Sequence, residues 1–229
     1  MAILDMSTSG ERTLPDPLPA DPMPLLLAWF TEAHERAVQP NPNAMTLATV
    51  DPDGRPSARI VLCKAIEPNA GYLVFHTNYR SRKGRALEAN PRAAVVFHWD
   101  ALDLQARVEG PVVRAPASES DAYFQTRPIE RRVGAWASDQ SEPIESRAAL
   151  EQKVAEAVAR FGVAEVLSGA AAIPRPPHWG GYRIYAERVE LWVAGNGRLH
   201  DRACWERRLT PGADRTFVGG MWAATRLQP

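Results

Sequence analysis

Basic side chains gather between residues 59 and 92 of a chain that is neutral overall, with 27 basic and 27 acidic residues. Within this stretch, Arg and Lys outnumber Asp and Glu by seven to two. Arg82 and Lys83 fall at the expected start of a helix, where free backbone N–H groups and the helix dipole favour anions. Arg adds bidentate phosphate binding and Lys a point charge. The pattern indicates a phosphate clamp, and the alternative is a solvated basic face balanced by acids elsewhere.

Tyr123, Arg127 and Arg131 form a second candidate anion site. Tyr123 and Arg127 are four residues apart on a predicted helix, so they share a face. Pro128 disfavours a continuous helix as far as Arg131, although a turn there could still aim both guanidinium groups at one phosphate. The alternative is a surface tyrosine packed on an arginine stem.

Arg198, His200 and Arg202 alternate along a segment that we expect to be a strand, which would point all three to one side. Three basic groups on one strand face are unfavourable unless an anion or solvent lies opposite. Histidine can also exchange a proton near neutral pH. The segment is therefore a candidate catalytic site, and the alternative is a solvent-facing edge strand.

The chain lacks the motifs of several common enzyme classes. It has no dinucleotide-binding or P-loop glycine pattern and no serine-hydrolase elbow, and its histidines show no metal-ligand spacing. Cys63 and Cys204 are too few for a disulfide framework, and Cys63 is expected to be a core thiol rather than a nucleophile.

Composition and the N-terminal segment limit which partners and which cellular location we expect for the protein. A sequence pI of about 7.0 argues against a nucleic-acid binder, and no apolar run approaches the ~20 residues of a membrane helix. The N-terminus lacks the basic start and apolar block of a secretory signal. We expect a cytoplasmic protein with a small-molecule ligand and neither a nucleic-acid nor a membrane partner.

Short strands with helices between them must position these side chains. Residues 1–20 are predicted to be a flexible tail, and residues 21–229 a single domain. Alternating apolar residues and turn signals predict strands at 44–50, 56–64, 71–77, 92–99, 104–114, 181–195, 198–209 and 221–227. Helical periodicity predicts helices at 22–39, 81–90, 118–127 and 147–161. This order favours a mainly β fold with peripheral helices, of the α+β class and built on a β-barrel.

Several segments together resemble pyridoxine/pyridoxamine 5′-phosphate oxidases. They occur in the order seen in that family: RIVLCK at 59–64, FHTNYRSRKG at 75–84, YFQTRP at 123–128, GAWASDQS at 134–141, HWGGYR at 178–183, ELW at 190–192 and RLHDR at 198–202. The resemblance implies a split β-barrel homodimer that binds flavin mononucleotide (FMN) at the subunit interface. It also implies a cytosolic oxidase that makes pyridoxal 5′-phosphate by passing a hydride from the substrate carbon to the flavin, with O2 as the acceptor and H2O2 as a product.

The resemblance also implies roles for individual residues. By position in the motifs, flavin contacts would come from Arg59, Ile60, Val61, Leu62, Cys63, Lys64, His76, Thr77, Arg82, Lys83, Gln105, Gln140, Ser141, Trp192 and Arg202. Substrate contacts would come from Lys64, Tyr123, Arg127, Arg131, Arg198, Leu199 and His200, with Arg198 and His200 as the catalytic pair. The chain departs from the family where His76 replaces the usual tyrosine or phenylalanine and Arg131 replaces a serine.

Two other functions stay open at this stage. One is a related split-barrel FMN oxidase that acts on another heterocycle, as in phenazine biosynthesis, and the other is a non-catalytic flavin- or pyridoxal-phosphate-binding protein. Lys64 and Tyr123 favour the vitamin B6 substrate, because the phenazine enzymes tend to lose both. Arg198 and His200 argue against a non-catalytic binder.

Overall fold

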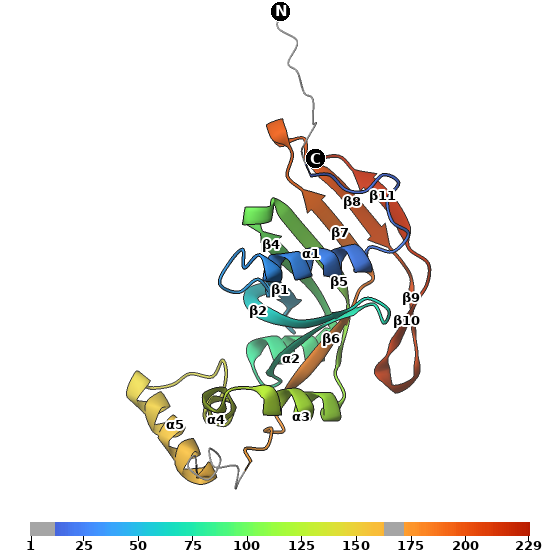
Figure 1. The fold of residues 1–229 in the computed structure, drawn as a ribbon. Helices are drawn as coiled ribbons and strands as arrows, with labels where there is room; N and C mark the ends of the chain where they lie inside the picture. Colours follow the sequence, from blue (N-terminus) through green and yellow to red (C-terminus); the bar gives the residue numbers. More distant parts are fainter. Residues whose placement is uncertain (1–11, 163–171) are drawn as a thin grey trace, which may run out of the picture.

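A barrel of antiparallel strands forms the centre of the protein in the computed structural model, which describes residues 12–162 and 172–229. Six strands close it in the order β5-β4-β1-β2-β3-β6, and β6 pairs back onto β5. Their bounds are β1 (Ala44–Val50), β2 (Pro56–Glu67), β3 (Tyr72–Asn78), β4 (Arg92–Trp99), β5 (Leu104–Arg114) and β6 (Trp179–Tyr185). From the free side of β5 the sheet continues through β7 (Arg188–Val193), β8 (Asp201–Glu206) and β11 (Ala223–Leu227). The expected split β-barrel is confirmed (Figure 1).

Strand β5 joins the barrel to this extension by changing partners along its length. Leu104–Glu109 pair with β7, whereas Val112–Arg114 pair with β6. The change falls at Gly110, where a Cβ atom would lie 1.9 Å from the carbonyl oxygen of Tyr185. Only glycine permits this close approach of two backbones, so Gly110 is required for the split.

The described ranges contain five helices, which lie on the outside: α1 (Met23–Glu35), α2 (Arg82–Ala89), α3 (Ala117–Thr126), α4 (Ile129–Ala137) and α5 (Arg147–Phe161). Helix α1 covers the barrel, while α3, α4 and α5 form a group at its lower end in Figure 1. Helix α4 was not predicted from the sequence, because Pro128 and the run of charges after it obscure the apolar positions Val133 and Ala137. The described part of the chain also contains a hairpin of β9 (Leu209–Pro211) and β10 (Phe217–Gly219) and the 3₁₀ turns η1 (Asp100–Leu102), η2 (Asn196–Arg198) and η3 (Ala213–Arg215).

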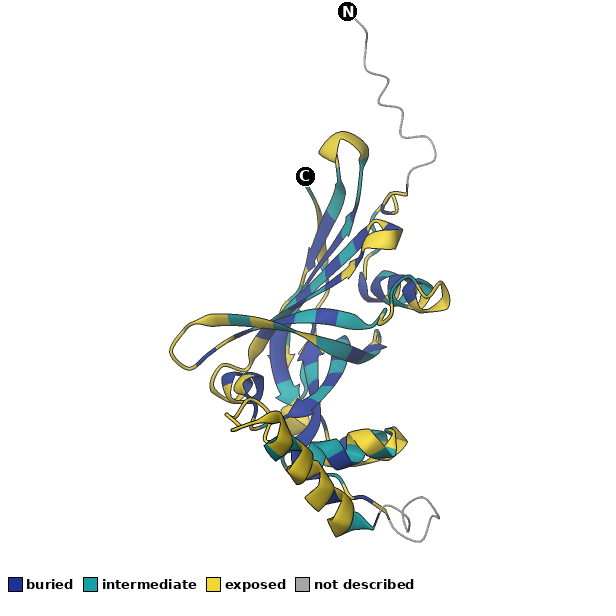
Figure 2. Cartoon of the chain, turned by 90° about the vertical axis from the view of Figure 1, so that its left-hand side faces the viewer, coloured by how far each residue is buried: buried dark blue, intermediate teal, exposed yellow. Residues whose placement is uncertain are grey.

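Two hydrophobic cores hold these elements in place. The main core fills the barrel and the space under α1, and its largest fully buried side chains include Phe75, Phe97, Trp99 and Trp205. A smaller core around Phe124 and its neighbours packs α3, α4 and α5 together. Figure 2 shows the buried residues following the strands, whereas α5 is largely exposed. None of the helices in the described ranges is long and apolar enough to cross a membrane.

The packed part of the chain begins before residue 21. Leu14 is buried in the main core, and its backbone N–H donates to Asp201 Oδ2 at 2.8 Å. The Trp205 indole likewise donates to the carbonyl oxygen of Pro19 at 2.8 Å. Residues 1–11 of the predicted tail lie outside the described residues.

Candidate functional site

A cleft of about 440 Å³ lies between the barrel and helices α3 and α4. It brings together many of the side chains singled out from the sequence: Ile60, Val61, Leu62, Lys64, His76, Thr77, Lys83, Tyr123, Arg127, Arg131 and Gln140. Four of these carry a formal positive charge, and no Asp or Glu of the described residues lines the cleft. An anion is therefore the ligand that the electrostatics of this cleft favour.

Lys64 reaches the cleft because strand β2 contains a bulge. Cys63 pairs with Phe75 and Ala65 with Val74, so Lys64 is an extra residue on β2. A bulge redirects a side chain that regular alternation would send elsewhere. Cys63 points into the core, where burial raises the pKa of its thiol to about 12. The expected core thiol at position 63 is confirmed.

Lys83 provides a desolvated ammonium group in the cleft. Its Nζ lies 3.2 Å from Thr77 Oγ1, 3.3 Å from Ser81 Oγ and 3.2 Å from Gln140 Oε1. No carboxylate in the described ranges pairs with it, and burial, with the nearby Arg59 guanidinium, lowers its pKa to about 8. Such a group gains from an anionic ligand that would restore its charge balance.

Arg59 and Arg82 lie beside this group but outside the cleft lining. The Arg59 guanidinium donates to Thr49 Oγ1 at 2.7 Å and to the carbonyl oxygen of Leu47 at 3.2 Å. Arg82 Nε donates to Asp51 Oδ2 at 3.0 Å, and this contact holds the pKa of the Asp51 carboxyl below its usual range. In this structure, therefore, Lys83 rather than Arg82 presents its charge to the cleft.

The second group of cations lies at the junction between α3 and α4. Helix α3 ends at Thr126, and Arg127 has extended backbone angles (ψ 145°) directly before Pro128. The prediction that Tyr123 and Arg127 share a helical face is therefore wrong, because the proline ends the helix. The resulting turn nevertheless aims Tyr123, Arg127 and Arg131 into the same cleft.

His76 and Tyr123 stack at 4.1 Å between ring centroids, and His76 and Trp179 stack at 5.2 Å. Burial, followed by repulsion from Lys64 and Arg127, lowers the pKa of His76 to about 4, so its ring is neutral at pH 7. Its Nδ1 is buried without a hydrogen-bond partner in the described part of the chain. Trp179 was not predicted as a site residue, and its sequence signal is the pair of glycines that follows it.

The segment from residue 198 to 202 lies far from this cleft. In Figure 1 the turn η2 is at the upper end of the extended sheet, whereas α3 and α4 are at the opposite end. The predicted strand face of Arg198, His200 and Arg202 is wrong. Arg198 has a left-handed backbone (φ 66°) at the end of η2, and β8 begins only at Asp201. The glycines at 195 and 197 cause this turn, since a Cβ atom on Gly195 would lie 2.1 Å from the carbonyl oxygen of Leu199.

The predicted site residues not yet described lie in or near this segment, except Ser141. They are Gln105, Trp192, Leu199 and His200. The His200 ring packs against Trp192 in a tilted arrangement, with 4.6 Å between ring centroids, and its Nδ1 accepts a hydrogen bond from the Gly195 backbone N–H at 3.2 Å. Gln105 is opposite Trp192 in the register of β5 and β7. Leu199 is exposed, at 55%. Ser141 follows Gln140 in a left-handed conformation (φ 76°) and does not line the cleft.

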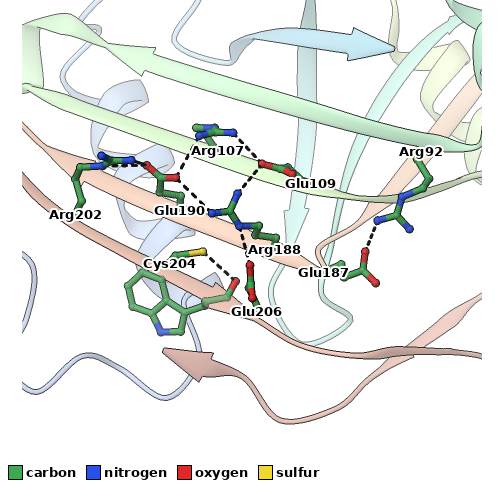
Figure 3. A network of polar contacts seen from close by, with 10 residues as sticks. Arg92, Arg107, Glu109, Glu187, Arg188, Glu190, Arg202, Cys204 and Glu206 are labelled. Carbon is green, nitrogen blue, oxygen red and sulfur yellow. Dashed lines mark hydrogen bonds and ion pairs between the residues drawn. The ribbon is translucent and has the colours of Figure 1, made fainter. Parts of the chain in front are cut away.

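Arg202 is held by a network of ion pairs across β5, β7 and β8 (Figure 3). Its Nη2 lies 2.8 Å from Glu190 Oε1, and its Nε also donates to that oxygen, at 3.2 Å. Arg107 donates to the other Glu190 oxygen at 3.2 Å. Glu190 is only 4% exposed, so a buried carboxylate fixes the Arg202 guanidinium.

The fold and the cleft define a class, that of split-barrel proteins with a cationic ligand cleft, and comparisons with known proteins identify the family. Residues 30–161 match the family described as pyridoxamine 5′-phosphate oxidase, and residues 179–229 match the pyridoxine 5′-phosphate oxidase C-terminal dimerisation region. The chain belongs to the pyridoxine/pyridoxamine 5′-phosphate oxidase family.

Individual relatives agree with this assignment. The chain is 51% identical over 209 residues to the pyridoxine/pyridoxamine 5′-phosphate oxidase of Cupriavidus necator, covering 91% of this chain and 89% of that protein. It is 50% identical over 231 residues to the Bordetella avium protein of the same name, covering all of both chains. Among solved structures, PhzG from Burkholderia lata in complex with tetrahydrophenazine-1-carboxylic acid aligns with a TM-score of 0.79 at 32% identity, covering 93% of this chain and 95% of that one.

Proposed function

We propose that the protein is an FMN-dependent oxidase that converts pyridoxine 5′-phosphate or pyridoxamine 5′-phosphate to pyridoxal 5′-phosphate in the cytoplasm, with O2 as acceptor and H2O2 as product. The observation that carries the proposal is one cleft that Lys83 lines on one side and Lys64, Arg127 and Arg131 on the other, with no carboxylate of the described residues in its lining. Both the cofactor and the substrate of this reaction are phosphate monoesters, so two anion sites are required.

The first group of residues fits the phosphate of FMN. The Lys83 ammonium is desolvated and has only neutral acceptors around it, which are Thr77, Ser81 and Gln140. Arg59 adds positive potential nearby, and Arg82 could exchange Asp51 for a phosphate oxygen. When bound, the flavin supplies a two-electron acceptor that O2 can reoxidise.

The second group fits the phosphate of the substrate. Arg127 Nη1 is buried and has no hydrogen-bond partner among the described residues, and Lys64, Tyr123 and Arg131 line the same cleft. A guanidinium can bind two oxygens of a phosphate, and a phenol can donate a further hydrogen bond. These residues would fix one end of the substrate, which orients its reacting carbon.

A second copy of the chain would complete the site. Gln105, Trp192, Arg198, His200 and Arg202 lie on β5, β7, η2, β8 and the segment that joins η2 to β8, and none of them lines the cleft of its own chain. They lie in or beside the part that matches the dimerisation region. In a homodimer, the partner's extension would place these side chains over the cleft. Arg198 would then cover the substrate ring, and His200 would orient it or handle a proton.

A second candidate function is oxidation of another heterocycle. It is favoured by the similarity to PhzG, whose structure holds tetrahydrophenazine-1-carboxylic acid, an anion without a phosphate. The exposed Arg131 in the cleft could serve a carboxylate as well as a phosphate. Lys64 and Tyr123, both in the cleft lining, favour the vitamin B6 substrate instead.

Purification followed by aerobic turnover tests the proposal. We expect a yellow dimer with one flavin per subunit, which oxidises pyridoxine 5′-phosphate or pyridoxamine 5′-phosphate and releases peroxide. Unphosphorylated pyridoxine is the matched control, and it should be a much poorer substrate. Turnover of tetrahydrophenazine-1-carboxylic acid without turnover of either B6 phosphate would select the second function. A colourless monomer that FMN cannot reconstitute would contradict both.

A further inference from the structure

Three nearly parallel rings lie at the base of the cationic cleft, and we call them the ring cluster: His76, Tyr123 and Trp179. Their planes are within 21° of one another, and their centroids are 4.1, 5.2 and 6.2 Å apart. A cation lies over a ring at each side of the cluster. Lys64 Nζ is 5.9 Å from the Tyr123 ring, and the Arg127 guanidinium carbon is 4.5 Å from the Trp179 ring. The cluster therefore contacts the cations that the proposed function assigns to the substrate phosphate.

Strand pairing fixes the positions of His76 and Trp179. In the β3–β6 register His76 is opposite Gly181, so Trp179 is its diagonal neighbour on the same face. A Cβ atom on Gly181 would lie 3.1 Å from His76 Nε2, so a larger residue there would push the imidazole away. Trp179 is 8% exposed and also packs edge-on against Phe124, with 5.2 Å between centroids. The indole is consequently a rigid surface.

Arg127 depends on this surface for its orientation. Its side chain leaves an extended residue between two helices, and Trp179 and Phe124 are the rings under its guanidinium, at 4.5 and 5.4 Å. A stacked guanidinium keeps its N–H groups in the plane of the fork, where they can donate to a ligand. Since Nη1 is buried and has no partner in the described residues, stacking rather than hydrogen bonding holds it there.

His76 contributes a ring without adding charge. Lys64, Arg127 and Arg175 all raise the local potential around it, and together with burial they lower its pKa to about 4. A protonated imidazole at this position would repel the cations that must hold the phosphate. A neutral imidazole instead supports Tyr123 by stacking while leaving the positive potential to the clamp.

We propose that Trp179 and His76 are positioning residues of the substrate-phosphate site, which hold Arg127 and Tyr123 in the geometry that binds a phosphate monoester. This inference rests on the proposed function and deepens it. The ring cluster thus selects phosphorylated over unphosphorylated B6 vitamers, although neither positioning residue carries a charge at neutral pH.

Substituting Trp179 tests the proposal through the split between KM and kcat. Loss of a desolvated cation–π contact in Trp179→Leu should raise KM for pyridoxine 5′-phosphate about 5- to 30-fold and leave kcat within about twofold. Trp179→Phe keeps a flat ring and should raise KM less. The matched control is Trp136→Leu, which removes an arginine stack of the same length, 4.5 Å to Arg160, outside the cleft lining. This control should leave KM unchanged.

Calorimetric titration separates positioning from general damage to the fold. Trp179→Leu should weaken binding of pyridoxal 5′-phosphate to the flavin-loaded protein by a similar factor and leave binding of pyridoxal, which has no phosphate, unchanged. In an Arg127→Ala background, Trp179→Leu should have no further effect on pyridoxal 5′-phosphate, because Trp179 acts through Arg127.

Three results would overturn the inference: an unchanged KM in Trp179→Leu, equal weakening of pyridoxal and pyridoxal 5′-phosphate, or an undiminished effect in the Arg127→Ala background. A wild-type protein that oxidises neither B6 phosphate would instead refute the proposed function. The titrations would still report on the ring cluster in that case, so the two failures are distinguishable.

Discussion

The cleft and the segment at residues 198–202, which we call the distal segment, differ in whether their cationic side chains have carboxylate partners. In the cleft, the Lys83 side chain and the Nη1 atom of Arg127 are buried with no carboxylate partner in the described residues. In the distal segment, Arg202 is neutralised by Glu190. Burying a charge without a partner is unfavourable, and pairing it recovers much of that loss. The difference indicates that the cleft is built for an external anion, whereas the distal segment is built to hold its own side chains still.

Removing the Glu190 carboxylate should produce the largest effect on this contrast. Glu190→Ala would leave Arg107 and Arg202 without their buried partner, which typically costs about 3–5 kcal/mol of unfolding free energy. For a chain of this size, thermal melting should shift down by roughly 6–20 °C. The matched control is Glu187→Ala, since its pair with Arg92 is on the surface. Surface pairs contribute about 0–1 kcal/mol, and equal shifts in the two variants would contradict the contrast.

Mixing two inactive variants, one substituted in the cleft and one in the distal segment, should show whether the cleft of one subunit meets the distal segment of its partner. Arg127→Ala and Arg198→Ala should each lower kcat/KM about 10- to 150-fold, the value of a charge-assisted hydrogen bond. Half of the dimers formed at random from equal amounts are hybrids, and each hybrid keeps one intact site, so activity should recover to about a quarter of wild type.

A mixture of Arg127→Ala with Lys64→Ala is the control for this experiment. Both residues line the same cleft, so every site in such a hybrid lacks one of them and activity should stay low. If the Arg127 and Arg198 variants exchange chains without regaining activity, the two regions do not meet between subunits.

The pH dependence of stability should give the smallest of the three effects. It tests whether the Lys83 ammonium in the cleft lacks an ionic partner. The pKa of Lys83 is lowered to about 8, against about 10.4 for a free lysine. Between these values the unfolded chain binds more protons, so stability of the flavin-free protein should rise with pH. We expect a gain on the order of 1 kcal/mol between pH 7.5 and about 10 in urea unfolding.

Lys83→Gln should abolish this gain, whereas Lys153→Gln should keep it, because Lys153 is an exposed residue paired with Asp139. Loading with FMN should also flatten the curve, since the phosphate would compensate the ammonium charge. Parallel pH curves for wild type and Lys83→Gln would show that Lys83 is not the desolvated cation of the cleft.

Local patterns in the sequence predicted the barrel strands and much of the cleft. Alternation and turn signals located β1 to β5, and the family motifs pointed to Lys64, Tyr123 and Arg127, which the fold does bring together. These features were accessible because residue type and near neighbours determine them. The assignment of individual cofactor and substrate contacts stays a prediction.

Features that depend on distant parts of the chain were not accessible. The bulge at Lys64 exists only in the pairing of β2 with β3, and Trp179 joins His76 only through the pairing of β3 with β6. Likewise, the charge of Arg82 is taken up by Asp51, 31 residues earlier. The turn at Arg198 was missed for a different reason: alternation of basic residues suggested a strand, although the nearby glycines favour a turn.

The closing strand of the barrel also sets the order of events during synthesis. Strand β6 pairs with both β3 and β5, yet it is made after helices α1 to α5. Until it leaves the ribosome, both of those strands present open edges that can pair with another chain. At about 5–20 residues per second, the interval between the end of β5 and the end of β6 is roughly 4–14 s. The nascent chain is therefore exposed to mispairing, or to capture by a chaperone, until its barrel can close.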